Sequence, residues 1–344
     1  MNNQTLINTA AALVADNKGL LAMDESTPTC NKRFAALGIP QNEDFRRAYR
    51  DLLVTTPGIS DSISGVILYD ETIHQHTLDG TPMIAVLIAA GIIPGIKVDD
   101  GTHSLAGQSG EFITEGLDGL RERLGGYARL GARFAKWRAV FAVSDDLPSR
   151  GCIEANAHAL ARYAALSQEA GLVPIVEPEV LMDGDHSLAR CREVTETVLH
   201  AVFAQLHSQR VLLEGIILKP NMVVPGTRST ESAAGSVSAG MIAEATIGCL
   251  WRTVPAAVPG VAFLSGGQTP EQATERLNAM HVHFGTRLPW AVTFSFSRAL
   301  QQPVLAIWRG DAANTEAAQR ALQQRAQCNH AARRGTYLPS MEPA

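Results

Sequence analysis

Short apolar runs recur along the chain and alternate with longer segments of helical periodicity. Apolar runs without polar alternation are typical of strands buried on both faces, as in a parallel sheet. The pattern predicts eight strands, at Gly19 to Met23, Ile63 to Tyr69, Ile92 to Val98, Ala132 to Val140, Leu172 to Val176, Gly215 to Leu218, Val261 to Leu264 and Ala291 to Phe294.

The segments between these runs predict a helix after each strand. The expected helices are Asn42 to Leu53, Pro82 to Ala89, Gly119 to Leu130, Cys152 to Glu169, Ser187 to Leu206, Val237 to Trp251, Pro270 to Met280, Arg298 to Arg309 and a final one at Asn314 to Cys328. Eight strands that each precede a helix close into a barrel more readily than into an open sheet. We therefore expect an α/β protein, a (β/α)8 TIM barrel forming one domain over residues 1–344, with a short polar tail from about residue 329.

Charge and hydropathy exclude several partners. The net charge of −5 and pI near 6.1 offer no basic surface for nucleic acid or an anionic membrane. No apolar run reaches the roughly eighteen residues of a membrane span, and the start Met1-Asn2-Asn3-Gln4 lacks the basic residues of a signal peptide. We expect a cytoplasmic protein.

Two further features of the composition bear on assembly and redox state. Charged residues are 18% of the chain, below the roughly 25% of an average soluble protein, which suggests that subunit contacts cover part of the surface. The cysteines are odd in number, scattered and never in a CxxC pair, as expected of reduced, structural thiols: Cys30, Cys152, Cys191, Cys249 and Cys328.

Reactive side chains gather where the predicted strands end. The residues at or just past these ends are Asp24, Asp70, Glu71, Lys97, Asp99, Lys136, Arg138, Glu177, Glu179, Lys219, Ser265, Gly266, Gly267, Ser295 and Arg298. In a barrel the carboxyl ends of all strands meet at one mouth, where active sites are built. Strand alternation also places Lys136 with Arg138, and Glu177 with Glu179, on a common side.

Lys219 stands out because a buried strand delivers it to this mouth. A lysine there either pairs with an acid or becomes the neutral amine that attacks a carbonyl. Lys136 and Glu177 suit amine chemistry, as a second ammonium and as a proton carrier. From these residues alone, buried lysine–glutamate pairs that merely hold the barrel rim together are an equally good interpretation.

Two clusters are suited to anions. Ser265, Gly266 and Gly267 follow the seventh strand, where barrel enzymes often hold phosphate, and Arg298 follows the eighth. A second set of hydroxyls and cations could form another anion site: Ser26, Thr27, Thr29, Lys32, Arg33 and Lys97. Two clusters flanking one lysine predict a substrate with a phosphate at each end.

Seven segments together resemble class I fructose-bisphosphate aldolase, in that family's order and over nearly the whole chain. They are Leu21 to Thr27, Gly95 to Asp99, Phe134 to Arg138, Ile175 to Glu179, Leu218 to Met222, Phe263 to Gln268 and Phe294 to Leu300. The resemblance implies a homotetrameric TIM barrel of glycolysis and gluconeogenesis that uses neither metal nor other cofactor. Its substrates would be sugar phosphates. The reaction would be the reversible cleavage of fructose 1,6-bisphosphate to dihydroxyacetone phosphate and glyceraldehyde 3-phosphate.

The resemblance also implies individual roles. Lys219 would form the Schiff base, with Lys136 beside it to reduce its basicity and Glu177 as general acid and base. Glu179 would support Glu177 and Lys136, and Asp24 would take the proton of the C4 hydroxyl. The implied phosphate and substrate contacts are Ser265, Gly266, Gly267, Ser295, Ser297 and Arg298 around the C1 phosphate, Ser26, Thr29 and Lys97 around the C6 phosphate, with Arg33 nearby, and Arg138.

The chain departs from the family pattern at three points. Thr29 stands where serine is common, and Ser297 stands where animal members have glycine. Animal members also end in a tyrosine that reaches the active site, whereas this sequence continues only to Glu342-Pro343-Ala344 after Tyr337. We expect both substitutions to be tolerated, and the role of the terminal tyrosine in proton exchange at C3 to be filled differently or less well.

Three other interpretations fit parts of the sequence. Leu264 to Gln268 matches the signature of ATP-binding cassette proteins, but no phosphate-binding G-x-x-x-x-G-K-[ST] loop accompanies it. A zinc-dependent aldolase would need a third ligand beside His74 and His76 or His281 and His283. A catalytically inactive barrel used for binding would have lost a proton carrier, and none is lost.

Overall fold

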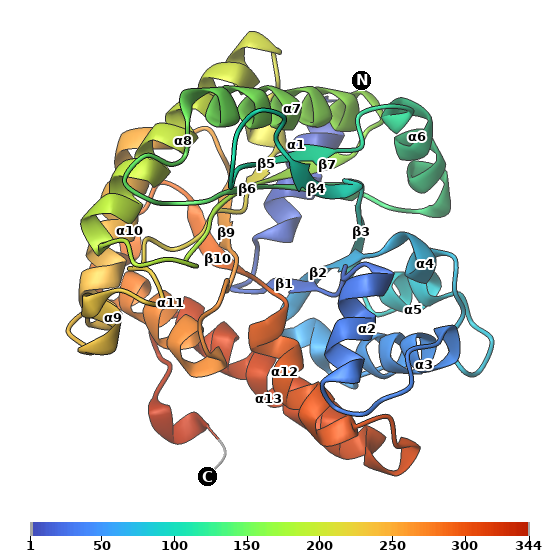
Figure 1. The fold of residues 1–344 in the computed structure, drawn as a ribbon. Coiled ribbons are helices and arrows are strands. Elements are labelled where there is room, and N and C mark those ends of the chain that lie inside the picture. Colours follow the sequence, from blue (N-terminus) through green and yellow to red (C-terminus); the bar gives the residue numbers. More distant parts are fainter. Residues whose placement is uncertain (1–2, 343–344) are drawn as a thin grey trace.

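A computed structural model of the chain describes residues 3–342. Figure 1 shows strands at the centre of the molecule with helices around them. The eight barrel strands pair in the closed order β1-β10-β9-β8-β7-β6-β3-β2, and every pair in the ring is parallel. The predicted single-domain (β/α)8 barrel is confirmed.

All eight predicted strands are present, with shifts at their ends. The barrel strands are β1 (Gly19–Ala22), β2 (Ile63–Leu68), β3 (Ile93–Lys97), β6 (Phe134–Phe141), β7 (Val173–Val180), β8 (Ile217–Leu218), β9 (Gly260–Phe263) and β10 (Ala291–Phe296).

Strand β7 differs most from the prediction, because it runs four residues past Val176 and contains Pro178. Its neighbour β8 ends at Leu218, so beyond Val176 only β6 pairs with β7. A proline is tolerated where one side of a strand needs no ladder hydrogen bond. Glu177 and Glu179 therefore lie within the strand instead of after it.

All nine predicted helices are present, together with helices that were not predicted. The α-helices of the described residues are α1 (Asn3–Leu13), α2 (Thr27–Ala35), α3 (Glu43–Val54), α4 (Asp70–Ile73), α5 (Met83–Ala89), α6 (Leu120–Leu130), α7 (Arg150–Glu169), α8 (Leu188–Ser208), α9 (Thr230–Ala233), α10 (Ala239–Thr253), α11 (Pro270–Phe284), α12 (Arg298–Trp308) and α13 (Thr315–Arg333). The sequence pattern missed α1, α2 and the single-turn helices α4 and α9. Helix α2 lacks apolar periodicity, since only Cys30 and Phe34 of its nine residues are buried.

Helix α1 covers the amino-terminal end of the barrel. Its Leu6, Ala10 and Leu13 are buried in one apolar cluster with side chains from inside the barrel, such as Phe134 and Ile217. The Phe134 ring needs a glycine opposite it, because a Cβ at Gly95 would lie only 2.2 Å from the ring. Side chains thus fill the amino-terminal end of the barrel interior, and space for a ligand remains at the carboxyl end of the strands.

A small hairpin at this carboxyl end was also not predicted. Strands β4 (Gly101–Ser104) and β5 (Phe112–Glu115) pair antiparallel to each other after β3. Thr114 fixes the hairpin to β6 by donating to the Arg138 carbonyl at 2.8 Å, and Asn156 on α7 donates to the Phe112 carbonyl at 2.8 Å. The hairpin adds a wall to the mouth of the barrel.

The last helix is longer than predicted. Helix α13 continues to Arg333, five residues past Cys328, so the expected tail begins near residue 334 instead of 329. The Arg333 guanidinium explains the extension, because it donates to the carbonyls of Val14, Lys18 and Val292 and ties the final turn to the barrel. Residues 343–344 of the expected tail lie outside the described part. Within residues 3–342 no helix combines the length and apolarity needed to cross a bilayer.

Candidate active site

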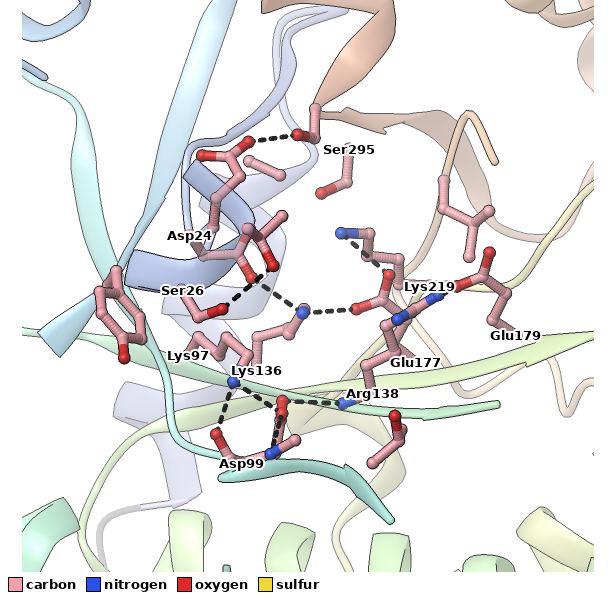
Figure 2. A pocket seen from close by; sticks show the side chains of 18 of the residues that line it. Asp24, Ser26, Lys97, Asp99, Lys136, Arg138, Glu177, Glu179, Lys219 and Ser295 are labelled. Carbon is pink, nitrogen blue, oxygen red and sulfur yellow. Dashed lines mark hydrogen bonds and ion pairs between the residues drawn. The ribbon is translucent and has the colours of Figure 1, made fainter. Parts of the chain in front are cut away.

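A cavity of about 990 Å³ opens at the carboxyl end of the barrel strands. Most residues that the sequence singled out for the site line it; Thr27, Glu71 and Gly267 do not. Figure 2 shows lysines and carboxylates converging there from β3, β6 and β7 and from positions just after β1 and β8, as expected when parallel strands end at one mouth.

A chain of alternating charges runs across the floor of the cavity. Glu177 lies between two lysines, with Oε1 3.2 Å from Lys219 Nζ and Oε2 3.0 Å from Lys136 Nζ. Lys136 also reaches Asp24, whose Oδ2 is 2.8 Å from its Nζ. All four residues are buried, with exposed fractions between 3% and 8%. Two lysines thus share one carboxylate in a site shielded from water.

The barrel register explains this convergence. Arg138 on β6 pairs with Glu177 on β7, so the two side chains face the same side of the sheet. Lys136, two residues before Arg138, faces that side as well and is therefore directed to the same side as Glu177. The Lys219 N–H donates to the Val176 carbonyl at 2.8 Å, which fixes the lysine directly after β8. Pro220 then ends the ladder, since it has no N–H to donate.

Burial and neighbouring charges act in opposite directions on these groups. Burial alone would raise the pKa of Asp24, but the ammoniums of Lys136, Lys219 and Lys97 hold it far below its usual range. Burial alone would lower the pKa of Lys136, but Asp24, Glu177 and Asp99 raise it well above its usual range. At neutral pH Asp24 is therefore a carboxylate and Lys136 an ammonium.

One end of the cavity is built by the loop after β9 and the start of α12. Arg298 lines it and donates to the Gly266 carbonyl, while Gly266 itself adopts φ +56°, a conformation that favours glycine. Ser295 is buried here, and its hydroxyl has no hydrogen-bond partner in the described structure. Gly267 does not line the cavity, and its N–H donates to Met182 Sδ at 2.9 Å.

The other end is built by α2 and the end of β3. Ser26 and Thr29 place their hydroxyl oxygens 3.1 Å apart at the start of α2. Lys97 Nζ lies 2.7 Å from Asp99 Oδ1 and donates to the Asp99 carbonyl at 2.6 Å. These residues line the cavity together with Lys32. Neighbouring hydroxyl and ammonium groups of this kind are suited to an anionic group.

Two predicted residues have partners that the sequence did not suggest. Glu179 forms an ion pair with Arg138, whereas the expected support of Lys136 by Glu179 has no counterpart among the contacts of these residues. Arg33 donates to Glu25 at 2.6 Å and lies 3.4 Å from the Ser297 hydroxyl, so it faces the α12 end of the cavity.

Sequence reasoning missed Glu25, which lines the cavity directly after Asp24. Its carboxylate accepts hydrogen bonds from arginines on two helices and from the start and first turns of α12. Two signals were available, namely its place one residue after a strand-end acid and its inclusion in the segment Leu21 to Thr27. The continuous apolar run of β1 gave no indication that a residue as distant in sequence as Gln301 would donate a hydrogen bond to Glu25.

The last tyrosine in the sequence does not reach this site in the described structure. Tyr337 is 6% exposed, and its hydroxyl donates to Glu342 Oε1 at 2.9 Å. It is not among the residues that line the cavity.

The histidine pairs considered for zinc lie in ordinary environments. His281 Nε2 is 3.0 Å from the Val292 carbonyl oxygen, and His74 Nε2 is 3.6 Å from Asp70. Within residues 3–342 no three His, Cys, Asp or Glu side chains are placed to hold a metal ion together. All five cysteines are buried and free of disulfides.

Comparison with known proteins now decides the family. The model of the class I fructose-bisphosphate aldolase family matches residues 5–344. This chain belongs to the class I fructose-bisphosphate aldolase family. Members of this class cleave fructose 1,6-bisphosphate reversibly through a lysine Schiff base, and the chain is a carbon–carbon lyase that acts on sugar phosphates.

Individual relatives agree over almost their full length. A probable fructose-bisphosphate aldolase class 1 of Xanthomonas campestris is 55% identical over 338 residues, covering 98% of this chain and 99% of the relative. The cytosolic fructose-bisphosphate aldolase 6 of Arabidopsis thaliana is 51% identical, covering 96% and 91%. A solved structure of fructose-bisphosphate aldolase from Plasmodium falciparum, in complex with TRAP and a small-molecule inhibitor, has a TM-score of 0.94 and 45% identity, covering 97% and 95%.

Proposed function

We propose that Lys219 is the nucleophile of this aldolase, that Glu177 and Asp24 transfer the protons of the reaction, and that Lys136 stays a cation beside Lys219 and reduces its basicity. The observation that supports this assignment best is the position of Glu177, whose two oxygens contact two different buried lysines. One lysine can then become covalently bound while the other keeps its charge. A buried nucleophile next to a proton carrier is the usual arrangement for amine catalysis.

In the first stage Glu177, whose Oε1 lies 3.2 Å from Lys219 Nζ, accepts one proton from the Lys219 ammonium, and the neutral amine attacks the C2 carbonyl carbon of the substrate. Glu177 gives this proton to the C2 oxygen, which becomes a hydroxyl, then takes a second proton from the nitrogen and passes it to the hydroxyl, which leaves as water. The product is a protonated imine. Lys136 remains an ammonium throughout, because Asp24 and Glu177 stabilise its charge.

In the second stage Asp24 accepts the proton of the C4 hydroxyl and the C3–C4 bond breaks. The bonding electrons move into the imine, which becomes an enamine, and glyceraldehyde 3-phosphate leaves. A carboxylate with so low a pKa is a weak base, so the cationic imine must supply much of the driving force as an electron sink. Protonation of C3 and hydrolysis of the imine then release dihydroxyacetone phosphate.

The two ends of the cavity would bind the two phosphates. Ser265, Gly266 and Arg298, with Ser295 and Ser297 beside them, would hold the C1 phosphate at the α12 end. Ser26, Thr29 and Lys97 would hold the C6 phosphate at the α2 end. Arg33 contacts Ser297, so we assign it to the C1 end instead of the C6 end. Arg138 and Glu179 form the rim between them, and Gly267 would contribute only if Met182 moved away from its N–H.

Borohydride trapping tests this assignment. Sodium borohydride added with dihydroxyacetone phosphate should inactivate the enzyme by reducing an imine at Lys219, because only a covalent imine is reducible there. Peptide mapping locates the label, and the other cavity lysines serve as internal controls. A label on Lys136 or Lys97, or no label at all, would contradict the assignment. EDTA should leave activity unchanged, and a loss reversed by zinc would favour the metal-dependent class.

We also propose a homotetramer located in the cytoplasm. Two observations support subunit contacts: the charged fraction of 18%, and large apolar side chains on the surface, among them Leu78, Ile88 and Val282 at 52% to 64% exposure. The cytosolic location named for the Arabidopsis relatives supports the compartment. Light scattering should give about four times the 36.8 kDa chain mass, and a mass near 36.8 kDa would contradict the tetramer.

A further inference from the structure

Glu25 is the most heavily bonded carboxylate at the cavity. Its Oε1 accepts from Arg33 at 2.6 Å, from the Ser297 hydroxyl at 2.6 Å and from Gln301 at 2.8 Å. Its Oε2 accepts from Arg50 at 2.6 Å. Glu25 is 8% exposed, and it draws together the loop after β1 and the helices α2, α3 and α12.

This bonding leaves Glu25 no part in proton transfer. Both oxygens are held by cationic or strongly polar donors, and an arginine pair of this kind keeps a carboxylate charged. A negative charge is also unsuited to a phosphate-binding cavity unless cations cancel it. Arg33 and Arg50 do so, and the net charge of the cluster stays positive. The role of Glu25 must therefore be to hold other groups in place.

Ser297 is the residue that links Glu25 to the substrate-binding end of the cavity at the start of α12. A serine at the start of a helix usually caps it, but the Ser297 side chain makes no capping bond to α12. Its hydroxyl donates to Glu25 instead, and receives Gln301 at 3.3 Å and Arg33 at 3.4 Å. The bond fixes the residue immediately before Arg298, and so the direction in which α12 and Arg298 leave β10.

We propose that Glu25 is a positioning residue for the C1 phosphate: through Ser297 and Arg33 it fixes the start of α12, so that Arg298 meets the substrate without rearrangement. The proposal rests on the proposed function only in taking a phosphate monoester as the ligand at this end. It assigns a purpose to the serine that stands where animal members of the family have glycine. A rigid support of this kind lowers the cost of ordering a binding arginine.

Ser297→Ala tests the proposal, because it removes the link without removing a charge. We expect KM for fructose 1-phosphate to rise about three- to tenfold and by a larger factor than kcat falls, since the phosphate keeps its direct partners, including the backbone N–H of residue 297, but Arg298 loses its support. Fructose 1-phosphate is the sharper probe, because it carries only the phosphate bound at this end. Ser297→Thr, which keeps the hydroxyl, should restore most of the loss.

Ser64→Ala is the matched control. The Ser64 hydroxyl is buried and donates to the carbonyls of Leu13 and Gly19 at the amino-terminal end of the barrel, far from the cavity in the fold. Ser64→Ala should lower Tm and leave KM unchanged, whereas Ser297→Ala should change KM with a smaller effect on Tm. Glu25→Gln should reproduce the KM change if it folds, and the serine variants decide the question if it does not.

Two results would overturn the proposal. One is an unchanged KM for fructose 1-phosphate in Ser297→Ala; the other is a KM change that Ser297→Thr fails to restore. Binding of inorganic phosphate, followed as the rise in Tm with phosphate concentration, gives the same comparison without catalysis. If borohydride fails to label Lys219 in the unaltered enzyme, the proposed function falls, but the phosphate titration still decides on Glu25.

Discussion

Replacing Lys97 by alanine separates substrate binding from chemistry in this cavity. Lys97 ends β3, and its side chain is 14% exposed at the α2 end, with Nζ 2.7 Å from Asp99. Under the proposed division of the cavity, Lys97 contacts only the C6 phosphate. Lys97→Ala should therefore damage cleavage of fructose 1,6-bisphosphate far more than cleavage of fructose 1-phosphate, which has nothing to place there.

The magnitude follows from one lost charge-assisted contact. Such a contact contributes roughly 1.5 to 3 kcal/mol, so kcat/KM for the bisphosphate should fall about ten- to a hundredfold. Part of the loss can appear in kcat, because binding energy at C6 also orients the C4 hydroxyl towards Asp24. The fold should survive, since Asp99 keeps the N–H groups of Gly101 at 3.2 Å and Arg138 at 3.3 Å.

The assay compares kcat/KM for both substrates in three variants. Lys18→Ala makes the same chemical change just before β1, at the amino-terminal end of the barrel, and should leave both values near those of the unaltered enzyme. Lys219→Ala should abolish both activities. Equal losses for the two substrates in Lys97→Ala would refute the reasoning, because Lys97 would then act in the chemistry or the fold and not at a separate phosphate site.

Two further predictions concern stability. Burial would raise the pKa of Glu25, but Arg33 and Arg50 lower it from 4.5 to about 2. The Glu25 carboxylate therefore adds to the free energy of unfolding above pH 4.5, and this stabilisation is lost as the pH falls towards 2. The stability difference between the unaltered protein and Glu25→Gln, measured by urea unfolding, should shrink by roughly 3 kcal/mol across that window, and a constant difference would count against it. Gly95→Ala should destabilise the barrel by about 1 to 3 kcal/mol through overpacking, because its Cβ would lie 2.2 Å from the Phe134 ring. Adding Phe134→Ala should make the glycine substitution nearly neutral in a double-mutant cycle, and strictly additive costs would show that the two sites are independent.

The sequence by itself determined the strands, their order and most of the cavity lining. Parallel strands buried on both faces are continuous apolar runs, and closure of the barrel brings their carboxyl ends together whatever the loops do. Placing Asp24 and Lys219 in one site therefore needed only their positions just after β1 and β8, whereas Lys136 and Glu177 lie within β6 and β7 and reach the site because strand alternation turns them to the inside of the barrel. The prediction failed locally where no apolar period exists, as in α2, or where a neighbouring strand ends early, as beside Pro178 on β7.

Only the tertiary structure decided which charges pair. Glu25 bonds Gln301 across 276 residues of sequence and Arg33 meets Ser297 across 264, and no local pattern encodes such contacts. Glu179 forms an ion pair with Arg138, and Met182 Sδ accepts a hydrogen bond from the N–H of Gly267. Strand register and the path of the loops determine which partners lie close enough for these contacts. The residue types at the site follow from the order of the chain, but their pairing follows from the closed barrel, which sets side by side strands and helices that are far apart in sequence.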